Sequence, residues 1–288
     1  FMQKINNQLA KKFSKYGYHV IKNINNFELI KNLEKKIISK LDNPNIIKTP
    51  KIIKNSLYSK QDFRGPLGKL KHNLSKKLIR KGIKFYKHKT NAISFKQPLI
   101  NFNECLELIL NDKVLENVSL ILGNNIRLGY VALSCQMNNK LEENDINFFH
   151  TDDHLNKSVI KKNKLIKLTI PISTHPKIHK DYTHLKINKF KIKNYLNQYF
   201  SLKEMPSNLK KKVISPSVRN IDGLLFDPDN FYHLARKPKR NIRIMLYIVF
   251  IKKGNYLEKK ASKLKINKKD FKKLKKEHKK FLDLLTII

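Results

Sequence analysis

His150 and Asp152 are separated by one threonine and follow two phenylalanines. On an extended strand, residues two positions apart project to the same face, so these two side chains can bind one metal ion together. A third ligand has to come from another part of the chain. His233 is the candidate, because it follows the apolar run 223–226 and a turn that contains Pro228.

Two imidazoles and one carboxylate on one face of an octahedron leave three positions open, an arrangement typical of non-haem Fe(II) oxygenases. Arg243 lies ten residues after His233, inside an apolar run. A guanidinium in such a strand is costly unless it is paired, and it can hold a carboxylate through two parallel hydrogen bonds. The far carboxylate of 2-oxoglutarate, whose keto-acid end chelates Fe(II), needs such a partner.

Gln136 and Thr169 lie on strands expected to line the core and are candidates for hydrogen bonds to 2-oxoglutarate; ordinary strand polarity is the competing interpretation. Asp153 faces away from Asp152 on a strand, so we do not expect it to bind the metal. His175, His179 and His184 are interpreted as loop residues near the mouth of the site that could face the substrate. Lys180 and Lys186 could help bind an anionic substrate, although any loop in this lysine-rich chain would contain lysines.

An isolated His-x-Asp motif is weak evidence, since a chain with 10 histidines and 22 acidic residues can contain one by chance. The prediction depends on four features that agree: a histidine at a strand end, a second histidine after a strand, an arginine inside the next strand, and their order along the chain. The alternative interpretation is a surface His-Asp pair with an unrelated histidine near a turn.

The pattern of apolar residues predicts strands at these positions and helices that pack against the strands. Expected strands, in addition to a short one after Gly17, are 127–137, 147–152, 165–173, 223–226 and 242–251. Expected helices are 27–41, 103–122 with Gly123 as its C-cap, and 267–288, which is rich in lysine.

These elements predict an α+β fold in which a double-stranded β-helix, a jelly-roll or cupin-like core, carries the site. We expect one domain over residues 1–288, with a helical N-terminal part (1–123), a β-core (124–252) and a basic C-terminal helical tail (253–288). The helix 27–41 has Asn25 or Asn26 as a candidate cap, and its expected buried face holds Ile30, Leu33, Ile37, Ile38 and Leu41.

The composition sets limits on the class of protein. Hydrophobic residues make up 40% of the 288 residues, which indicates a globular chain with a sizeable core. Two cysteines, Cys105 and Cys135, argue against a disulfide framework and fit a reducing compartment. The start of the chain lacks the apolar stretch of a signal peptide, and the run 242–251 is too short to span a bilayer. We therefore expect a soluble, cytoplasmic protein.

The formal net charge is +40, which would attract nucleic acid, anionic membranes or acidic substrates. Lysine, asparagine and isoleucine all have A/T-rich codons, so genome composition explains part of this charge. It does not explain why lysine so far exceeds glutamate. Basic residues are spread along the chain with few aromatics among them, a poor match to a nucleic-acid stacking platform, and we do not expect a dedicated nucleic-acid partner.

Several segments together resemble the phytanoyl-CoA dioxygenase family of Fe(II)/2-oxoglutarate oxygenases. The matching segments are FSKYGYHVIK at 13–22, VLENVSLILG at 114–123, HTD at 150–152, GLLFD and FYH within 223–233, and NIRIMLYIVF at 241–250. The resemblance implies a double-stranded β-helix, with His150, Asp152 and His233 as iron ligands and Arg243 as the partner of 2-oxoglutarate.

This chain departs from that family at two places. The family often has a tryptophan near the first iron ligand, but this chain has no tryptophan and shows Phe148 and Phe149 there. The family's Gly-rich stretch after the metal strand is replaced by residues 173–184, which affects the expected substrate more than the iron site. The leading hypothesis is a dioxygenase that uses Fe(II), 2-oxoglutarate and O2 to hydroxylate a small molecule. The alternatives are a non-catalytic metal-binding protein and a basic nucleic-acid-binding protein on the same scaffold.

Overall fold

The structure is a computed structural model, and it describes most of the N-terminal helices, the strands and the C-terminal segment. The described residues are 2–40, 47–48, 92–137, 148–150, 165–172, 185–191, 199–201, 207–219, 221–235, 242–255 and 257–288. The expected ligand Asp152, Asp153 and the expected loop 173–184 lie outside them. No helix within these ranges is long and apolar enough to cross a membrane.

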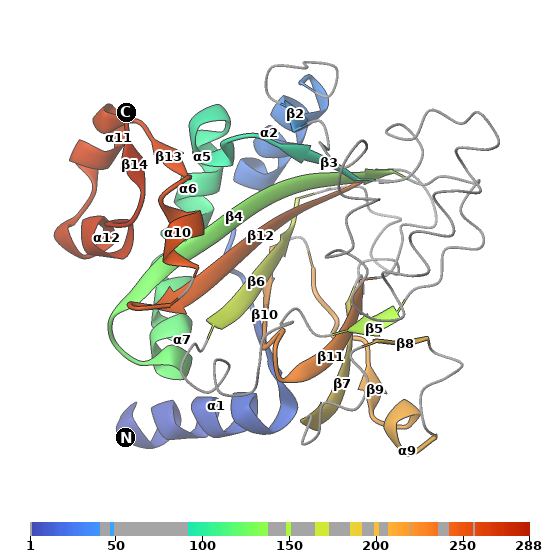
Figure 1. Cartoon of the computed structure of the whole chain (residues 1–288). Coiled ribbons are helices and arrows are strands. Elements are labelled where there is room, and N and C mark those ends of the chain that lie inside the picture. Colours follow the sequence, from blue (N-terminus) through green and yellow to red (C-terminus); the bar gives the residue numbers. More distant parts are fainter. Residues whose placement is uncertain are drawn as a thin grey trace.

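The larger of two antiparallel sheets crosses the middle of the molecule (Figure 1). Within the described residues its strands lie in the order β1 (Tyr18–Ile21), β10 (Gly223–Phe226), β6 (Leu165–Pro171), β12 (Ile242–Lys252), β4 (Ile126–Met137), β3 (Ala92–Phe95) and β2 (Ile47–Lys48). The long central pair β12 and β4 has a β-bulge between Val249 and Phe250. Strands from both ends of the chain therefore share one sheet.

The smaller sheet faces one side of the larger one. Its strands lie in the order β8 (Tyr199–Ser201), β5 (Phe148–His150), β11 (Phe231–Ala235), β7 (Leu185–Lys191) and β9 (Val213–Ile214). Consecutive strands alternate between the two sheets from β4 to β7, and again from β9 to β12. A chain that alternates between two facing sheets brings distant segments together between them.

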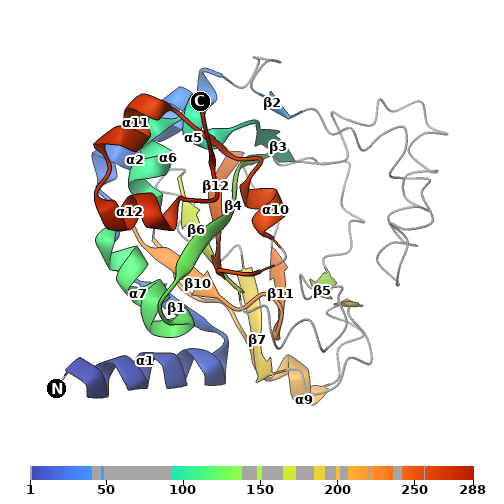
Figure 2. The ribbon, with the colours of Figure 1, turned by 60° about the vertical axis from the view of Figure 1, so that its left-hand side comes forward.

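Helices cover the other face of the larger sheet. Figure 2 shows α2, α6 and α7 on one side of β6 and β10, and β7 and β11 on the opposite side. The helices in this part are α1 (Met2–Tyr16), α2 (Phe27–Ile38), α5 (Pro98–Asn101), α6 (Asn103–Ile109) and α7 (Asp112–Leu122), and α9 (Ser207–Lys210) lies between β8 and β9. The sheet is thus buried on both faces along its centre.

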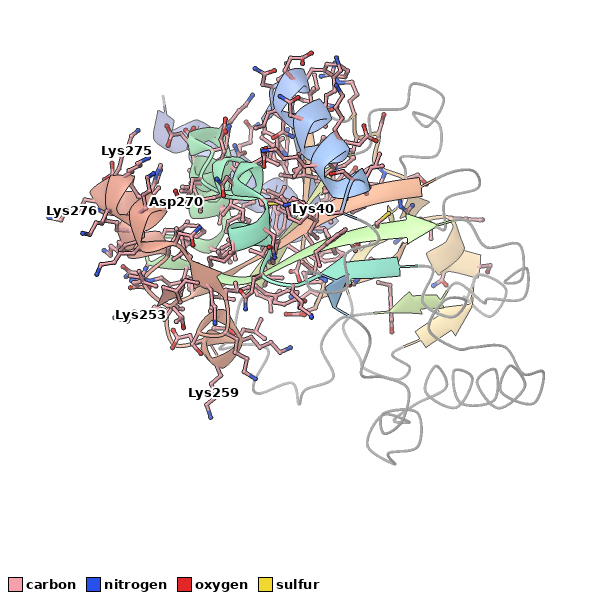
Figure 3. All side chains as sticks on the ribbon, turned by 90° about the horizontal axis from the view of Figure 1, so that it is seen from above. Lys40, Lys253, Lys259, Asp270, Lys275 and Lys276 are labelled. Carbon is pink, nitrogen blue, oxygen red and sulfur yellow. The ribbon has the colours of Figure 1, made fainter. Side chains whose placement is uncertain are left out.

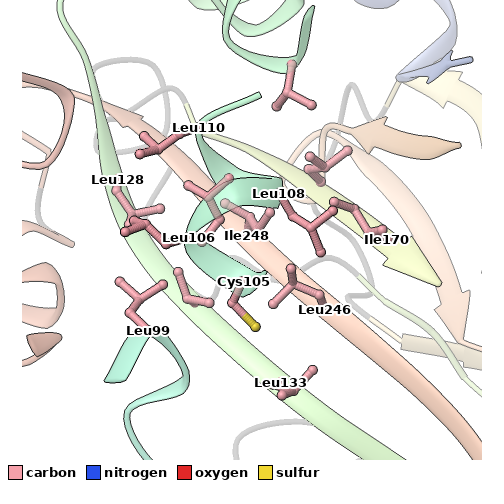
Figure 4. Close-up of a cluster of buried hydrophobic side chains, with 14 of the residues drawn as sticks. Leu99, Cys105, Leu106, Leu108, Leu110, Leu128, Leu133, Ile170, Leu246 and Ile248 are labelled. Carbon is pink, nitrogen blue, oxygen red and sulfur yellow. The ribbon is translucent and has the colours of Figure 1, made fainter. Parts of the chain in front are cut away.

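The main core lies between these helices and the larger sheet. The buried side chains shown in Figure 4 include Leu99, Cys105, Leu106, Leu108, Leu110, Leu128, Leu133, Ile170, Leu246 and Ile248. Along β12, Ile244, Leu246 and Ile248 point into this core. Because side chains alternate along a strand, Arg243 and Tyr247 lie on the opposite face.

The helix predictions were right in type and partly wrong in extent. In α2, Asn26 is the N-cap, with its side chain accepting a hydrogen bond from the Glu28 backbone N–H at 2.8 Å. Ile38, expected on the buried face, is 50% exposed. The expected helix 103–122 is two helices, because the Asn111 side chain caps a new start by accepting from the Val114 N–H. Helix α1 was missed, and Leu41 lies outside the described residues.

The prediction of one C-terminal helix over 267–288 was wrong. Residues 267–288 hold α11 (Lys268–Lys273), α12 (Lys276–Phe281) and β14 (Thr286–Ile287). They follow α10 (Glu258–Ala261) and β13 (Lys265–Ile266), and β13 and β14 pair in parallel. The chain becomes extended at Leu274, which ends α11. This break lets Phe281 and Leu285 return to the main core, which a straight helix would carry away from it.

Candidate functional site

His233 lies in the middle of β11, a strand that the sequence did not predict as a separate element. Its side chain is only 4% exposed, and its ring centroid lies 5.1 Å from that of Phe226 on β10. Phe226 and Leu224 belong to a buried cluster with Phe231 of β11. His233 therefore points into the space between the two sheets, next to an apolar wall.

The turn between β10 and β11 determines the position of His233. The Asp227 carboxylate accepts hydrogen bonds from the backbone N–H groups of Asp229 and Asn230, at 3.2 and 3.0 Å. The Asp227 N–H donates to the Gly17 carbonyl at 2.9 Å. The ring of Phe231 packs against Gly17 itself. A short polar turn, tied to the start of β1, thus holds the strand that carries the histidine.

His150 of β5 is the backbone partner of His233. The antiparallel register pairs these two residues directly, although 82 residues separate them in the sequence. Residues directly opposite each other on antiparallel strands occupy the same face of a sheet. The structure therefore brings two of the three expected ligand positions to one face.

The third expected ligand and the complete metal cluster are not tested by the described part of the chain. Asp152 and the His150 side chain lie outside it. Among the side chains that the structure describes, no three His, Cys, Asp or Glu residues come together as a metal site. The triad of His150, Asp152 and His233 stays a prediction, with the positions of His150 and His233 as its structural basis.

Arg243 lies at the start of β12, and its side chain is buried between the two sheets. It is 1% exposed and is among the largest fully buried side chains of the described chain. Gln136 on β4 is its backbone partner across the strand pair. Thr169 on β6 is the backbone partner of both Tyr247 on β12 and Leu224 on β10. The expected Arg243, Gln136 and Thr169 positions thus share one face of the larger sheet.

The Thr169 hydroxyl is buried and has no hydrogen-bond partner among the described residues. A buried hydroxyl without a partner costs about 1–3 kcal/mol. Leu224, on the adjacent strand, belongs to the apolar cluster between the sheets, so the hydroxyl faces the same interior as His233. It is a polar atom suited to a ligand placed there.

Tyr247 and Ser134 lie on the same face of the larger sheet as Arg243, and sequence reasoning missed both. Burial raises the pKa of the Tyr247 phenol above its usual value, while the nearby Arg243 guanidinium and a hydrogen bond with Ser134 act in the opposite direction. The position of Tyr247 follows once Arg243 is placed inward, because residues four apart on a strand occupy one face. Ser134 is found only from the register of β4 with β12.

The interior between the sheets combines an apolar wall with a small set of polar groups. A guanidinium, a phenol and two hydroxyls line one sheet, and two histidine positions face them from the other. Such a combination is typical of a small-ligand site in which polar groups fix the orientation. The guanidinium suits a carboxylate, and the imidazole suits a transition metal.

Known proteins resemble this chain in structure but not in sequence. No family model and no curated protein sequence matches the chain. The structure resembles the epimerase SnoN, solved with Fe3+, alpha ketoglutarate and nogalamycin RO, at a TM-score of 0.53 and 8% identity over 87% of this chain and 84% of that one. It resembles HygX from Streptomyces hygroscopicus, solved with nickel and 2-oxoglutarate, at a TM-score of 0.54 and 12% identity over 86% of this chain and 87% of that one.

At these identities the likeness concerns the fold. It covers most of this chain and most of both neighbours, so the shared architecture extends beyond a single sheet. Both neighbours are proteins crystallised with a metal ion and 2-oxoglutarate. The narrower resemblance to phytanoyl-CoA dioxygenases stays a prediction, because no family model matches.

Proposed function

We propose that this chain is an Fe(II)- and 2-oxoglutarate-dependent oxygenase built on a double-stranded β-helix. One observation carries the proposal: Arg243 and His233, predicted from sequence as cosubstrate and metal residues, are both buried on strands whose inner faces border one space. The fold around them resembles that of SnoN and HygX. Neither sequence motif nor fold alone would support the function as well.

His150, Asp152 and His233 would hold the iron. Two imidazoles and one carboxylate leave open positions for a chelating keto acid and for oxygen. Bound iron would supply the activation of O2 that accompanies oxidative decarboxylation of 2-oxoglutarate to succinate and CO2. The protein orients His233 through the Asp227 turn and screens the ring with Phe226, which limits its contact with water.

Arg243 would bind the far carboxylate of 2-oxoglutarate. A buried guanidinium can form two parallel charge-assisted hydrogen bonds to it, and low local polarity strengthens them. The Tyr247 phenol and the Thr169 hydroxyl lie on the same face and would donate further hydrogen bonds. Gln136, the backbone partner of Arg243, is a third candidate.

The substrate is proposed to be a small molecule, with C–H hydroxylation as the reaction. SnoN is described as an epimerase and is solved with nogalamycin RO, so the same architecture also serves a reaction other than hydroxylation. Halogenation is disfavoured, since it needs the carboxylate position vacated for halide and this chain keeps Asp152. An anionic substrate fits the net charge of +40.

Anaerobic titration of the purified protein with Fe(II) and 2-oxoglutarate tests the proposal. We expect a weak visible charge-transfer band for the wild type and its loss in His233→Ala. His278→Ala is the matched control, because His278 is on α12 and pairs with Asp112, away from both sheets' inner faces. Its band should equal that of the wild type.

Admission of oxygen gives a second, independent measurement. The wild type should form succinate in the presence of Fe(II) and 2-oxoglutarate, and His233→Ala should not. A wild type that gives neither band nor succinate would contradict the proposal. A band without succinate would favour the alternative, a non-catalytic metal-binding protein on this scaffold.

A further inference from the structure

We propose that the surface formed by residues 252–288 binds the phosphate backbone of a nucleic-acid duplex. This segment contains 14 lysines against four acidic residues, and no arginine. Thirteen of these lysines are exposed. Figure 3 shows Lys253, Lys259, Lys275 and Lys276 projecting outward from the C-terminal elements. We call this the C-terminal lysine surface.

The segment is folded onto the body of the protein and holds its charges in place. Phe281, Leu282 and Leu285 are buried in the main core, and Leu257 packs with residues of β6 and β12. The Arg127 guanidinium, 3% exposed, donates to the Asp283 carboxylate at 2.6 Å. The lysines are therefore presented by a fixed scaffold.

The lysines of this surface are left largely uncompensated. Within the described residues, Lys275 is the one of them with an ion-pair partner, Asp112 at 3.8 Å. Three of the four acidic side chains are engaged elsewhere: Asp283 with Arg127, Glu258 with the Gly254 N–H and Asp270 with Asn267. Like charges held close together repel, and a polyanion relieves that repulsion.

Composition alone does not account for this excess. Helices α2, α6 and α7 together contain four lysines and six acidic residues. In α2, Lys31 pairs with Glu28, and Lys36 pairs with Glu104 of α6. A genome that favours lysine codons would enrich these helices as well. The excess belongs to particular surfaces.

A nucleic-acid duplex fits this surface better than the other polyanions. Lysine acts as a point charge on phosphate, and the described part of the segment offers neither guanidinium forks for bases nor exposed aromatic rings for stacking. A membrane surface would favour helices with an exposed apolar face, but Phe271 and Leu274 pack against the core and Phe281 is buried in it. The chemistry thus favours binding that is independent of sequence and driven by release of counterions.

Fluorescence anisotropy of a labelled DNA duplex of about 20 base pairs, titrated with the full chain, tests the proposal. The test variant replaces four exposed lysines of α11 by glutamine: Lys268, Lys269, Lys272 and Lys273. The matched control replaces four exposed lysines of α1 and α2 by glutamine: Lys11, Lys12, Lys15 and Lys35. Both variants lose the same net charge, and thermal unfolding checks that both remain folded.

We expect the α11 variant to bind roughly tenfold more weakly or worse, with a shallower dependence of log Kd on log salt, and the control to change about twofold. A Lys→Arg version of the α11 variant should restore binding. Equal losses in both variants, tighter binding to the single strand than to the duplex, or binding to anionic vesicles but not to DNA would each overturn the proposal. None of these measurements depends on iron, so their failure leaves the proposed oxygenase untouched.

Discussion

Arg243 and Thr169 are polar residues on strands whose opposite faces point into an apolar core. A position one residue away on either strand would have placed them among leucines and isoleucines, at a cost of several kcal/mol for the charge. The register of β12 with β4 and β6 therefore decides whether the site exists. Three predictions test individual residues.

Thr169→Val separates binding from stability. Removing a buried hydroxyl that has no partner among the described residues should leave the free protein as stable as the wild type, or more stable by about 1 kcal/mol. The same change should weaken 2-oxoglutarate binding, measured by the anaerobic band titration. A variant that loses stability and keeps full affinity would assign the hydroxyl to the fold.

Arg243→Lys tests the carboxylate contact. Lysine keeps the charge but cannot form the two parallel hydrogen bonds, so the Kd for 2-oxoglutarate should rise about tenfold or more. Arg127→Lys is the matched control, since Arg127 is equally buried but pairs with Asp283. It should alter thermal stability and leave the Kd unchanged; similar Kd changes in both variants would argue against a specific role for Arg243.

Asp222 gives a prediction about pH. Burial alone would raise its pKa, but hydrogen bonds from Arg219, the Asn23 N–H and Lys22 outweigh that effect and lower the pKa to about 2. The folded protein binds this proton less readily than the unfolded chain. The carboxylate therefore contributes stability above about pH 4, and loses about 2 kcal/mol of it as the pH falls to about 2.

Thermal unfolding across this range measures the effect. Asp222→Asn should be less stable than the wild type at neutral pH and should lose less stability between about pH 4 and about pH 2. Parallel curves for the two proteins over that range would show that Asp222 does not titrate as its contacts indicate.

Sequence reasoning found single residues where the surroundings made them conspicuous. Arg243 stood out because a charge interrupts an apolar strand, and His233 because a turn separates it from the strand before it. Tyr247 was missed because a tyrosine in a strand is ordinary, and only the pairing with Ser134 and Thr169 gives it a role. Pairing partners between distant strands cannot be read from one sequence without knowing the register.

At the scale of elements, the contact between Gly17 and β11 controls the position of His233. Gly17 has a φ of +76°, and a Cβ at this position would overlap the ring of Phe231. Phe231 is two residues before His233, and both side chains pack with Phe226 of β10. The glycine before β1 therefore lets the strand with the proposed ligand approach the larger sheet.

Gly17→Ala should displace β11 and weaken Fe(II) binding, besides destabilising the fold by several kcal/mol. Gly254→Ala is the matched control, because Gly254 has a φ of +88° and no atom within 4 Å of an added Cβ. It carries the backbone strain alone, about 1–2 kcal/mol, and should keep full iron affinity. Equal losses of stability in the two variants would contradict a steric role for Phe231.

Elements with a clear apolar period were predicted, and short polar ones were not. The strands β4, β6, β10 and β12 were expected because they are rich in buried apolar residues. Strand β7, with the sequence LKINKFK, holds three apolar residues among four lysine and asparagine residues and was missed. Lys186, expected in a loop, therefore lies on a strand. The apolar residues of the C-terminal segment have helical spacing, but burial of Phe281 and Leu285 in the main core requires the chain to turn, so the segment forms several short elements. Tertiary packing of this kind leaves no local signal.

At the scale of the whole molecule, the net charge of +40 opposes compaction. Salt should therefore stabilise the fold, with the melting temperature rising by several degrees between about 0.05 M and about 0.5 M NaCl. Differential scanning calorimetry at fixed pH measures this. A melting temperature that falls with NaCl would mean that specific ion pairs, such as Arg127–Asp283, contribute more to stability than self-repulsion costs.

The alternation of strands between two sheets has a consequence for how the protein is made. His150 pairs with His233, and Gln136 pairs with Arg243, so residues of the proposed site lie opposite partners that are far away in the sequence. During synthesis, the smaller sheet cannot be completed until β11 has left the ribosome, and the larger one not until β12 has followed. Contacts of such long range slow folding. The nascent protein should therefore pass through a metal-free, cosubstrate-free stage in which the N-terminal helices have formed, and acquire its binding site in one late step.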